Sequence, residues 1–233
     1  MGTAPTHPEL LDWLALEFIR QGWSLKKLHR LIVTSRIYRQ ASHPREQALR
    51  VDADARLLWR FPPRRLEAEA IRDGMLSVSG KLNLKMGGRG FDFFNQRGGL
   101  SDYVPKQTYD ANGWRRMIYA HEVRVQAVDI FGAFDCPDGN QSVPRRGRST
   151  TPMQALNLLN SAFVLDQANH LAARVKKDAG KNAEAQVRRA FHLTFGRAPE
   201  ARELAAAKKL TATHGLPALA RALFNTHEFI TIP

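Results

Sequence analysis

Apolar residues in the first forty positions recur every three or four residues, which is the spacing of one face of an α-helix. Two such runs are present, Leu10, Leu11, Leu14 and Phe18 in the first, and Leu25, Leu28, Leu31, Ile32 and Tyr38 in the second. Pro8 suits the first turn of one helix, Gly22 is placed to end it, and Ser24 can cap the next. The pattern therefore predicts a helical hairpin with a tight turn.

The middle of the chain loses this helical pattern. A third helix is predicted over residues 64–79, followed by Gly80 as its stop. Residues 81–113 hold six glycines interleaved with aromatic residues, which predicts an ordered loop or a binding loop rather than a linker. The stretch over residues 114–135 shows partial alternation around 117–125 that fits a short strand or a helix, and we predict a helix. A second loop rich in proline and glycine is predicted over residues 133–150.

The last third of the chain is again helical in pattern. Thr151 is a plausible N-cap, Pro152 occupies the first helical position, and Gln154 completes a capping box. One long helix is predicted from its apolar stripe, Leu156, Leu159, Phe163, Ala168, Leu171 and Val175. Three shorter helices are predicted over 183–195, 199–213 and 216–229, with Gly196 and Gly215 as stops.

These elements predict a mainly α fold, namely a single compact multi-helix domain over residues 1–233 with two long ordered loops. It would be helical over 1–80, loop-rich over 81–150 and helical over 151–233. A chain of 233 residues with 43% hydrophobic content is large enough to bury a core. No apolar run is long enough for a transmembrane segment, and the amino-terminal sequence lacks the layout of a secretion signal.

The net charge and the cysteine content limit the classes of ligand and of metal site that this chain can have. The formal net charge of +13 favours polyanionic partners such as nucleic acid, acidic polysaccharide or an anionic membrane surface. The single cysteine, Cys136, excludes an internal disulfide and any multi-cysteine metal or haem motif. The histidines form no His-Glu-x-x-His motif, and no hydrolase motif is present, so we predict no metal site.

A cluster of arginines directly precedes the predicted helix start at Thr151. Guanidinium groups together with free helix-start N–H groups are typical of a sulfate, phosphate or carboxylate site. The predicted anion-binding residues are Arg145, Arg146, Arg148, Ser149, Thr150 and Thr151. The alternative is neutralisation by nearby acids, for which the candidates are Glu69, Asp73, Asp135 and Asp138.

Two of these acids allow a second interpretation. Glu69 and Asp73 are four residues apart, so they share one helical face, as paired carboxylates for acid/base catalysis or metal binding would. Arg65 and Arg72 are spaced to pair with Glu69, however, and ion pairing on the helix surface accounts for the run. An enzyme site would have to combine the arginine cluster with Glu69, Asp73 or Asp135.

Several stretches resemble the Domain of Unknown Function 1553 family. They are HPELLDWLALEFIRQGWSLKKLHRLIVTSRIYRQAS, DARLLWRFPPRRLEAEAIRDGMLSVSGKLN, RRMIYAHEVR, FDCPD and RSTTPMQALNLLNSAFVLDQANHLAARV, and the resemblance runs on to FGRAPEARE and NTHEFI. The family is abundant in planctomycetes and related bacteria. The resemblance implies the carboxyl-terminal domain of a large exported protein with an upstream cytochrome-c-like domain and sulfatase-like neighbours. It also implies a role in polysaccharide breakdown or surface organisation.

The resemblance implies no catalytic residue and no cofactor in this chain, since haem c belongs to the upstream domain. Export to the periplasm or cell surface is implied, whereas a chain that truly starts at Met1 without a signal peptide would be cytoplasmic. The haem motif and the middle domain of relatives are missing, which indicates a shortened gene product or a fragment. In addition, GGRG stands where many relatives have Gly-Gly-Pro.

The function expected from these observations is a non-catalytic binding or scaffolding module of a bacterial cell-envelope assembly. Its expected ligand is an acidic or sulfated polysaccharide, and its expected protein partners are the upstream cytochrome-like domains or a sulfatase-like neighbour. Two alternatives remain open. One is an accessory enzyme domain that acts on acidic glycans, and the other is a nucleic-acid-binding helical domain that uses Lys26, Lys27 and Arg30.

Overall fold

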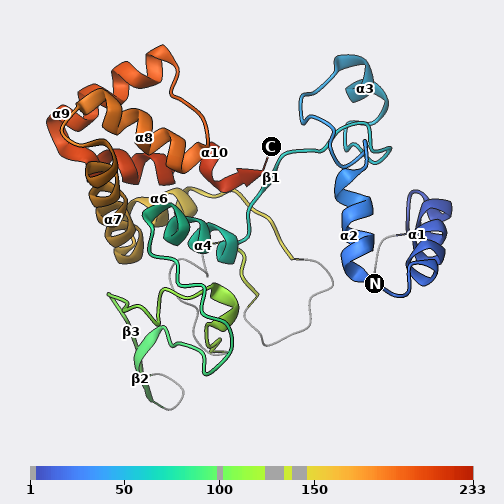
Figure 1. The fold of residues 1–233 in the computed structure, drawn as a ribbon, viewed down its shortest axis with the longest axis horizontal. Helices are drawn as coiled ribbons and strands as arrows, with labels where there is room; N and C mark the ends of the chain where they lie inside the picture. Colours follow the sequence, from blue (N-terminus) through green and yellow to red (C-terminus); the bar gives the residue numbers. More distant parts are fainter. Residues whose placement is uncertain (1–3, 99–101, 124–133, 138–145, 233) are drawn as a thin grey trace. The chain divides into compact units, whose positions relative to one another are not determined.

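The computed structural model describes residues 4–98, 102–123, 134–137 and 146–232. Over these residues the fold is mainly α, as predicted, with only short strands (Figure 1). Internal contacts divide the chain into two compact units. The first unit is Met1–Arg64 with Ile232–Pro233, and the second is Arg65–Thr231. The single domain expected from the sequence stays a prediction.

The first unit contains α1 (Pro8–Arg20), α2 (Leu25–Thr34) and α3 (Glu46–Val51). The predicted hairpin is confirmed, because Gly22 takes a left-handed φ of 73° and the Ser24 side chain accepts a hydrogen bond from the Lys27 N–H. The second helix ends at Thr34 and does not reach Tyr38. Ser35 leaves the helical conformation, and its hydroxyl accepts from the Tyr38 N–H, which competes with helical bonding.

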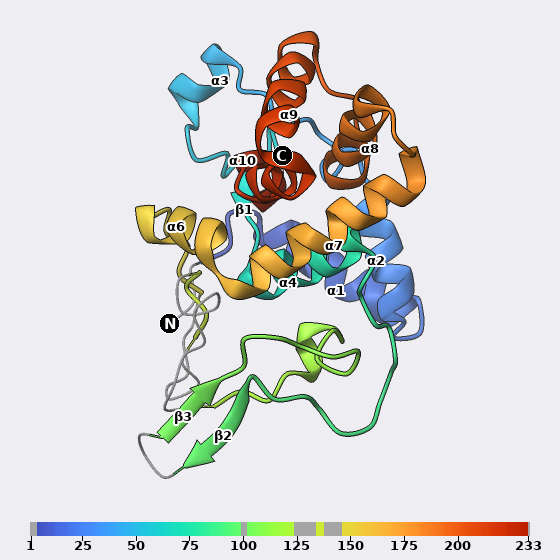
Figure 2. The same cartoon turned by 90° about the vertical axis from the view of Figure 1, so that its left-hand side faces the viewer.

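The second unit is built around four helices, α4 (Ala68–Ser79), α7 (Ala162–Ala179), α8 (Ala183–Phe195) and α9 (Ala201–Phe224). Helix α7 packs against the other three (Figure 2). Their facing residues form the core, including Ile71, Met75, Leu76, Leu171, Val175 and Phe224. Two shorter helices complete the unit, α6 (Pro152–Asn160) and α10 (His227–Ile230).

Helix boundaries follow local signals in most places. The stops at Gly80 and Gly196 are confirmed, since both are left-handed C-caps. The predicted break at Gly215 falls inside the range given for α9, where a φ of 79° and a ψ of 173° produce a kink between two helical segments. The third helix begins at Ala68 rather than at residue 64. The cause is that β1 (Arg64–Arg65) pairs with β4 (Thr231–Ile232), and beside it the Leu66 N–H donates to the Ile230 carbonyl at 2.7 Å.

The predicted long helix after Thr151 is two helices, α6 and α7, separated at Ser161. Ser161 has an extended ψ of 133°, which ends the first helix and begins the second. Leu158 and Val164 are both fully buried, although residues six apart lie on different sides of a continuous helix. The break therefore allows both side chains to enter one core.

In the described residues of the segment after α4, Phe91, Phe93 and Phe94 are part of the core, and Tyr103 and Tyr109 pack against it. This segment contains a two-stranded antiparallel hairpin of β2 (Phe94–Gly98) and β3 (Asp102–Pro105), which the sequence did not predict. The helix expected over 114–135 is wrong for the described residues 114–123, where only the short 3-10 turn η1 (Met117–Tyr119) forms. The backbone there pairs with Phe91 instead, through N–H···O bonds of 2.9 and 2.8 Å.

Candidate functional site

The arginine segment enters α6 through the predicted cap. The Gln154 N–H donates to the Thr151 hydroxyl, and the Thr151 N–H donates to the Gln154 side-chain oxygen, each at 3.4 Å. Pro152 occupies the first turn. The capping box is therefore confirmed, and these helix-start N–H groups already have partners within the chain.

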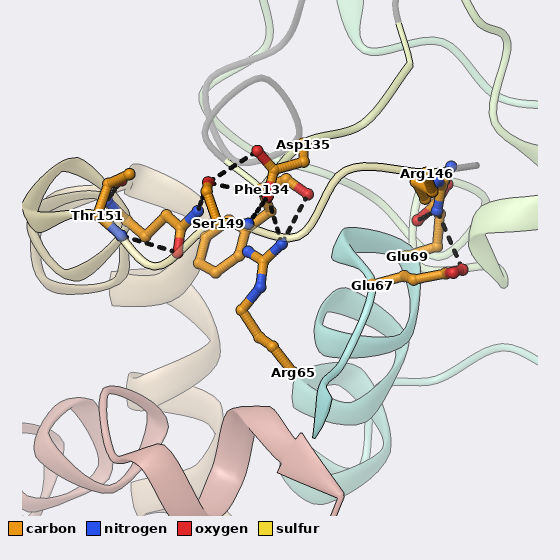
Figure 3. A network of polar contacts seen from close by, with 9 residues as sticks. Arg65, Glu67, Glu69, Phe134, Asp135, Arg146, Ser149 and Thr151 are labelled. Carbon is orange, nitrogen blue, oxygen red and sulfur yellow. Dashed lines mark hydrogen bonds and ion pairs between the residues drawn. The ribbon is translucent and has the colours of Figure 1, made fainter. Parts of the chain in front are cut away.

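An internal carboxylate lies where the predicted anion would bind (Figure 3). Asp135 accepts hydrogen bonds from the Ser149 N–H at 2.7 Å and from the Ser149 hydroxyl at 2.8 Å. Arg65 donates to the same carboxylate at 2.6 Å, and its guanidinium lies 5.1 Å from the centre of the Phe134 ring. The Ser149 N–H bond is the largest cause that holds the pKa of Asp135 below its ordinary value. We call these interactions the Asp135 contact.

A second group of charges, seen at the right of Figure 3, neutralises Arg146. Its two terminal nitrogens donate to the two oxygens of Glu69 at 2.8 and 2.7 Å, and one of them also donates to Glu67 at 3.0 Å. This bidentate pairing raises the pKa of Arg146. For Glu69, burial by itself would raise the pKa, but the bonds from Arg146 prevail and lower it. The geometry supports neutralisation by acids as the role of Arg146.

Cys136 lies beside this ion pair. Its thiol is half-buried, and its Sγ lies 3.8 Å from Oε1 of Glu69. Burial, followed by the charge of Glu69, raises the pKa of the Cys136 thiol to about 11. The thiol is therefore protonated near neutral pH, and this disfavours a role as nucleophile.

The other predicted site residues do not join these contacts. Arg148 and Thr150 are exposed, and Arg148 makes no ion pair with the described residues. Arg145 and Asp138 lie outside the described residues. Asp73 lies elsewhere, because its carboxylate accepts from the Met117 N–H at 2.9 Å.

The two arginines expected to pair with Glu69 have structural roles that the sequence interpretation missed. The pairing of Arg65 and Arg72 with Glu69 is wrong, since Arg65 precedes the helix and binds Asp135, while Arg72 points into the core. Arg72 donates to the carbonyls of Gly113 and Arg115. No local signal could reveal this, because those carbonyls are more than forty residues away in sequence.

The α1–α2 hairpin presents a second candidate site. No residue of either helix is buried. Eight large apolar residues in and between these helices are exposed. We call the seven that lie in α1, in the turn and at the start of α2 the hairpin surface: Leu10, Leu11, Trp13, Leu16, Ile19, Trp23 and Leu25. The exposed fraction reaches 67% for Leu16 and 66% for Trp23. An exposed apolar patch of this kind is typical of an interaction site.

These features define a mainly α protein with internally paired charges in the second unit and a helical hairpin rich in exposed apolar residues in the first. The model of the family described as "Protein of unknown function (DUF1553)" matches residues 1–211, and the chain therefore belongs to this family, as the resemblance predicted. No curated protein and no solved structure matches the chain. Within the described ranges, no three or more His, Cys, Asp or Glu residues are grouped as metal ligands would be, and none of the helices is long and apolar enough to cross a membrane.

The Asp135 contact predicts a specific pH dependence of stability. Asp135→Asn is expected to lower the free energy of unfolding at pH 7 by about 1–3 kcal/mol, since an amide is a weaker acceptor for these donors. The folded-state pKa of Asp135 is depressed, so its contribution is complete above the ordinary value of 3.8 and is lost as the pH falls below it. Urea unfolding of the wild type and of Asp135→Asn at pH 7 and pH 3 measures the difference in their free energy of unfolding at each pH. Exposed Asp12→Asn is the control, and an equal deficit of Asp135→Asn at both pH values would contradict the prediction.

Proposed function

We propose that this protein is a non-catalytic binding or scaffolding module and that the hairpin surface is its binding site. The observation that carries the proposal is the complete absence of buried residues from α1 and α2, although both helices are rich in large apolar side chains. Complete burial of an exposed Leu side chain is worth about 1.5–3 kcal/mol, and a partner that covers these partly exposed side chains would recover a part of that stabilisation for each.

The pairing of charges in the second unit supports a non-catalytic role. A catalytic carboxylate or thiol needs a free position for substrate and a pKa suited to proton transfer. Asp135 and Glu69 instead bind donors of the chain itself, and the thiol of Cys136 has a raised pKa. These contacts serve to join segments that are distant in sequence.

The setting of this module is also part of the proposal. We propose a cell-envelope assembly that handles acidic or sulfated polysaccharide, on the basis of the family resemblance and the net charge of +13. Exposed Arg148 is the described residue of the arginine cluster that is available to such an anion.

A nucleic-acid ligand is the second candidate. The observation that favours it is the exposure of Lys26, Lys27 and Arg30 along α2. If DNA is the ligand, its affinity must fall steeply with salt and depend on these three residues.

The binding-surface proposal is tested by substitutions that a buried core would not tolerate. We expect Leu16→Ser combined with Trp23→Ser to lower the melting temperature of the monomeric chain only slightly, through loss of the edge-to-face contact between Trp23 and Phe18, and to reduce binding of the hydrophobic dye bis-ANS. The reason is that neither side chain is buried in the fold. Protein is used at a concentration at which sedimentation shows only monomer.

The matched control is Leu28→Ser, which replaces a half-buried residue of the same hairpin and is expected to lower the melting temperature. A large loss of stability in the Leu16/Trp23 variant would mean that these side chains belong to the core, and the proposed function would then be rejected. If the variant and the wild type bind the dye equally, the proposed function is rejected as well.

A further inference from the structure

We propose that a second copy of this chain covers the hairpin surface, so that two α1–α2 hairpins associate around a two-fold axis as four packed helices. This inference rests on the proposed function, and it names the partner of the same surface. Three observations carry it: the distribution of apolar residues, the area exposed, and the charges of the two helices.

The apolar residues of the hairpin lie on more than one side of α1. Leu14 and Phe18 are half-buried, as are Leu28 and Leu31 of α2. Leu11, Leu16 and Ile19 remain more than half exposed. A helix that is apolar on several sides is typical of the interior of a bundle, whereas a helix at a two-helix surface needs one apolar face. A second hairpin supplies the two additional helices that complete such a bundle.

The exposed apolar area is of the order that a stable interface needs. The seven residues of the hairpin surface have exposed fractions between 37% for Leu10 and 67% for Leu16. Together they expose on the order of 800 Å², and a partner that covers the part facing it would bury an area approaching the roughly 800 Å² per partner of a standard interface. Two tryptophans, Trp13 and Trp23, are among them, and Trp is enriched among the residues that dominate binding energy.

The acidic residues of α1 in one copy are complementary in charge to the basic residues of α2 in a second copy. Helix α1 carries three acids and one arginine, while α2 carries three basic residues and no acid. A two-fold interface repeats every contact, so α1 of one copy against α2 of the other places opposite charges together twice. Exposed Glu9 and Asp12 can meet exposed Lys26 and Lys27 in this way.

The net charge of +13 opposes association of two copies, but this repulsion acts mainly over long distances. At physiological ionic strength the Debye length is about 8 Å, so charges farther apart are largely screened. The nearby groups across the proposed interface have opposite signs. Local attraction and apolar burial therefore outweigh the repulsion between the two chains.

Sedimentation equilibrium of the full chain tests the proposal. We expect a reversible monomer–dimer equilibrium for the wild type, and at least a tenfold weaker dimer for Leu16→Glu, because a carboxylate would be desolvated at the interface. The matched control is Val51→Glu on α3, which changes an apolar residue that is 82% exposed and lies outside the hairpin surface. This control is expected to dimerise as the wild type does.

Further variants distinguish a weakened interface from a folding defect. Trp23→Ser should also weaken the dimer, and far-UV circular dichroism of both variants should match the wild-type monomer. Asp12→Lys should weaken the dimer through charge alone, and adding Lys26→Glu should restore part of the affinity. Dimers that are unaffected by Leu16→Glu and Trp23→Ser would place the contact elsewhere and overturn the proposal.

A wild-type chain that stays monomeric at every concentration would also overturn the proposal. The dye and melting experiments then decide separately whether the proposed function stands. Reduced dye binding by a stable Leu16/Trp23 variant would keep the binding surface and assign it another partner. Salt-dependent DNA binding through Lys26, Lys27 and Arg30 by a monomer would identify that partner as nucleic acid.

Discussion

Arg72→Ala is expected to lower the free energy of unfolding by about 3–5 kcal/mol, the range for removal of one member of a buried polar network. The Arg72 residue is 1% exposed, and its guanidinium lies 5.0 Å from the centre of the Phe91 ring and 5.3 Å from that of Phe163. The substitution leaves a cavity between these rings. It also removes the donors to the carbonyls of Gly113 and Arg115, which are then buried without these hydrogen bonds.

Equilibrium urea unfolding at pH 7 measures this effect. Burial lowers the pKa of Arg72 to about 10, so the group remains charged at that pH. The matched control is Arg116→Ala, because Arg116 has a side chain that is 52% exposed and lies 3.8 Å from Asp73. Its loss should change stability by about 0.5 kcal/mol or less. Similar effects of the two substitutions would show that the buried position of Arg72 has no special role.

Arg115→Ala is expected to cost about 2–4 kcal/mol and to loosen the segment around residues 85–91. The Arg115 side chain donates to the carbonyls of Gly87 at 2.7 Å and Arg89 at 2.8 Å, and its guanidinium lies 3.7 Å from the centre of the Tyr119 ring. One buried cation thus binds the carbonyls of Lys85, Gly87 and Arg89, which lie in a segment without regular secondary structure.

Native-state hydrogen exchange shows which amides lose protection in Arg115→Ala. The amide of Phe91, which donates to the Tyr119 carbonyl at 2.9 Å, should exchange faster in Arg115→Ala, whereas amides of α8 should keep their protection. Lys85→Ala serves as the control, since Arg115 contacts only the backbone carbonyl of that exposed residue. Unchanged exchange at Phe91 in Arg115→Ala would contradict the assigned role.

The sequence predicted those parts of the fold that depend on neighbouring residues. Ser24 and Thr151 were identified as caps because a capping bond joins positions three residues apart. Gly80 and Gly196 were identified as stops because the left-handed conformation favours glycine. The hairpin of β2 and β3, by contrast, was missed, since its strands are short and lack a clear alternating pattern.

The candidate site was predictable only in part. Arg146, Glu69 and Asp135 were all recognised as candidate charges, but the sequence left an anion site and internal neutralisation both open. Arg146 and Glu69 are 77 residues apart, and Arg65 and Asp135 are 70 apart. Such pairings depend on how α4 and the segment before α6 meet, which local patterns do not describe.

The sequence by itself determined the mainly α class, most helix boundaries and the family, because helical periodicity, caps and family motifs are properties of residues close together in the chain. Only the tertiary structure decided which acid neutralises Arg146, why Arg72 is buried, and which apolar residues of the hairpin remain exposed. Ion pairing and burial depend on distance in space, and a chain with 35 basic and 22 acidic residues allows many pairings that only the folded backbone distinguishes.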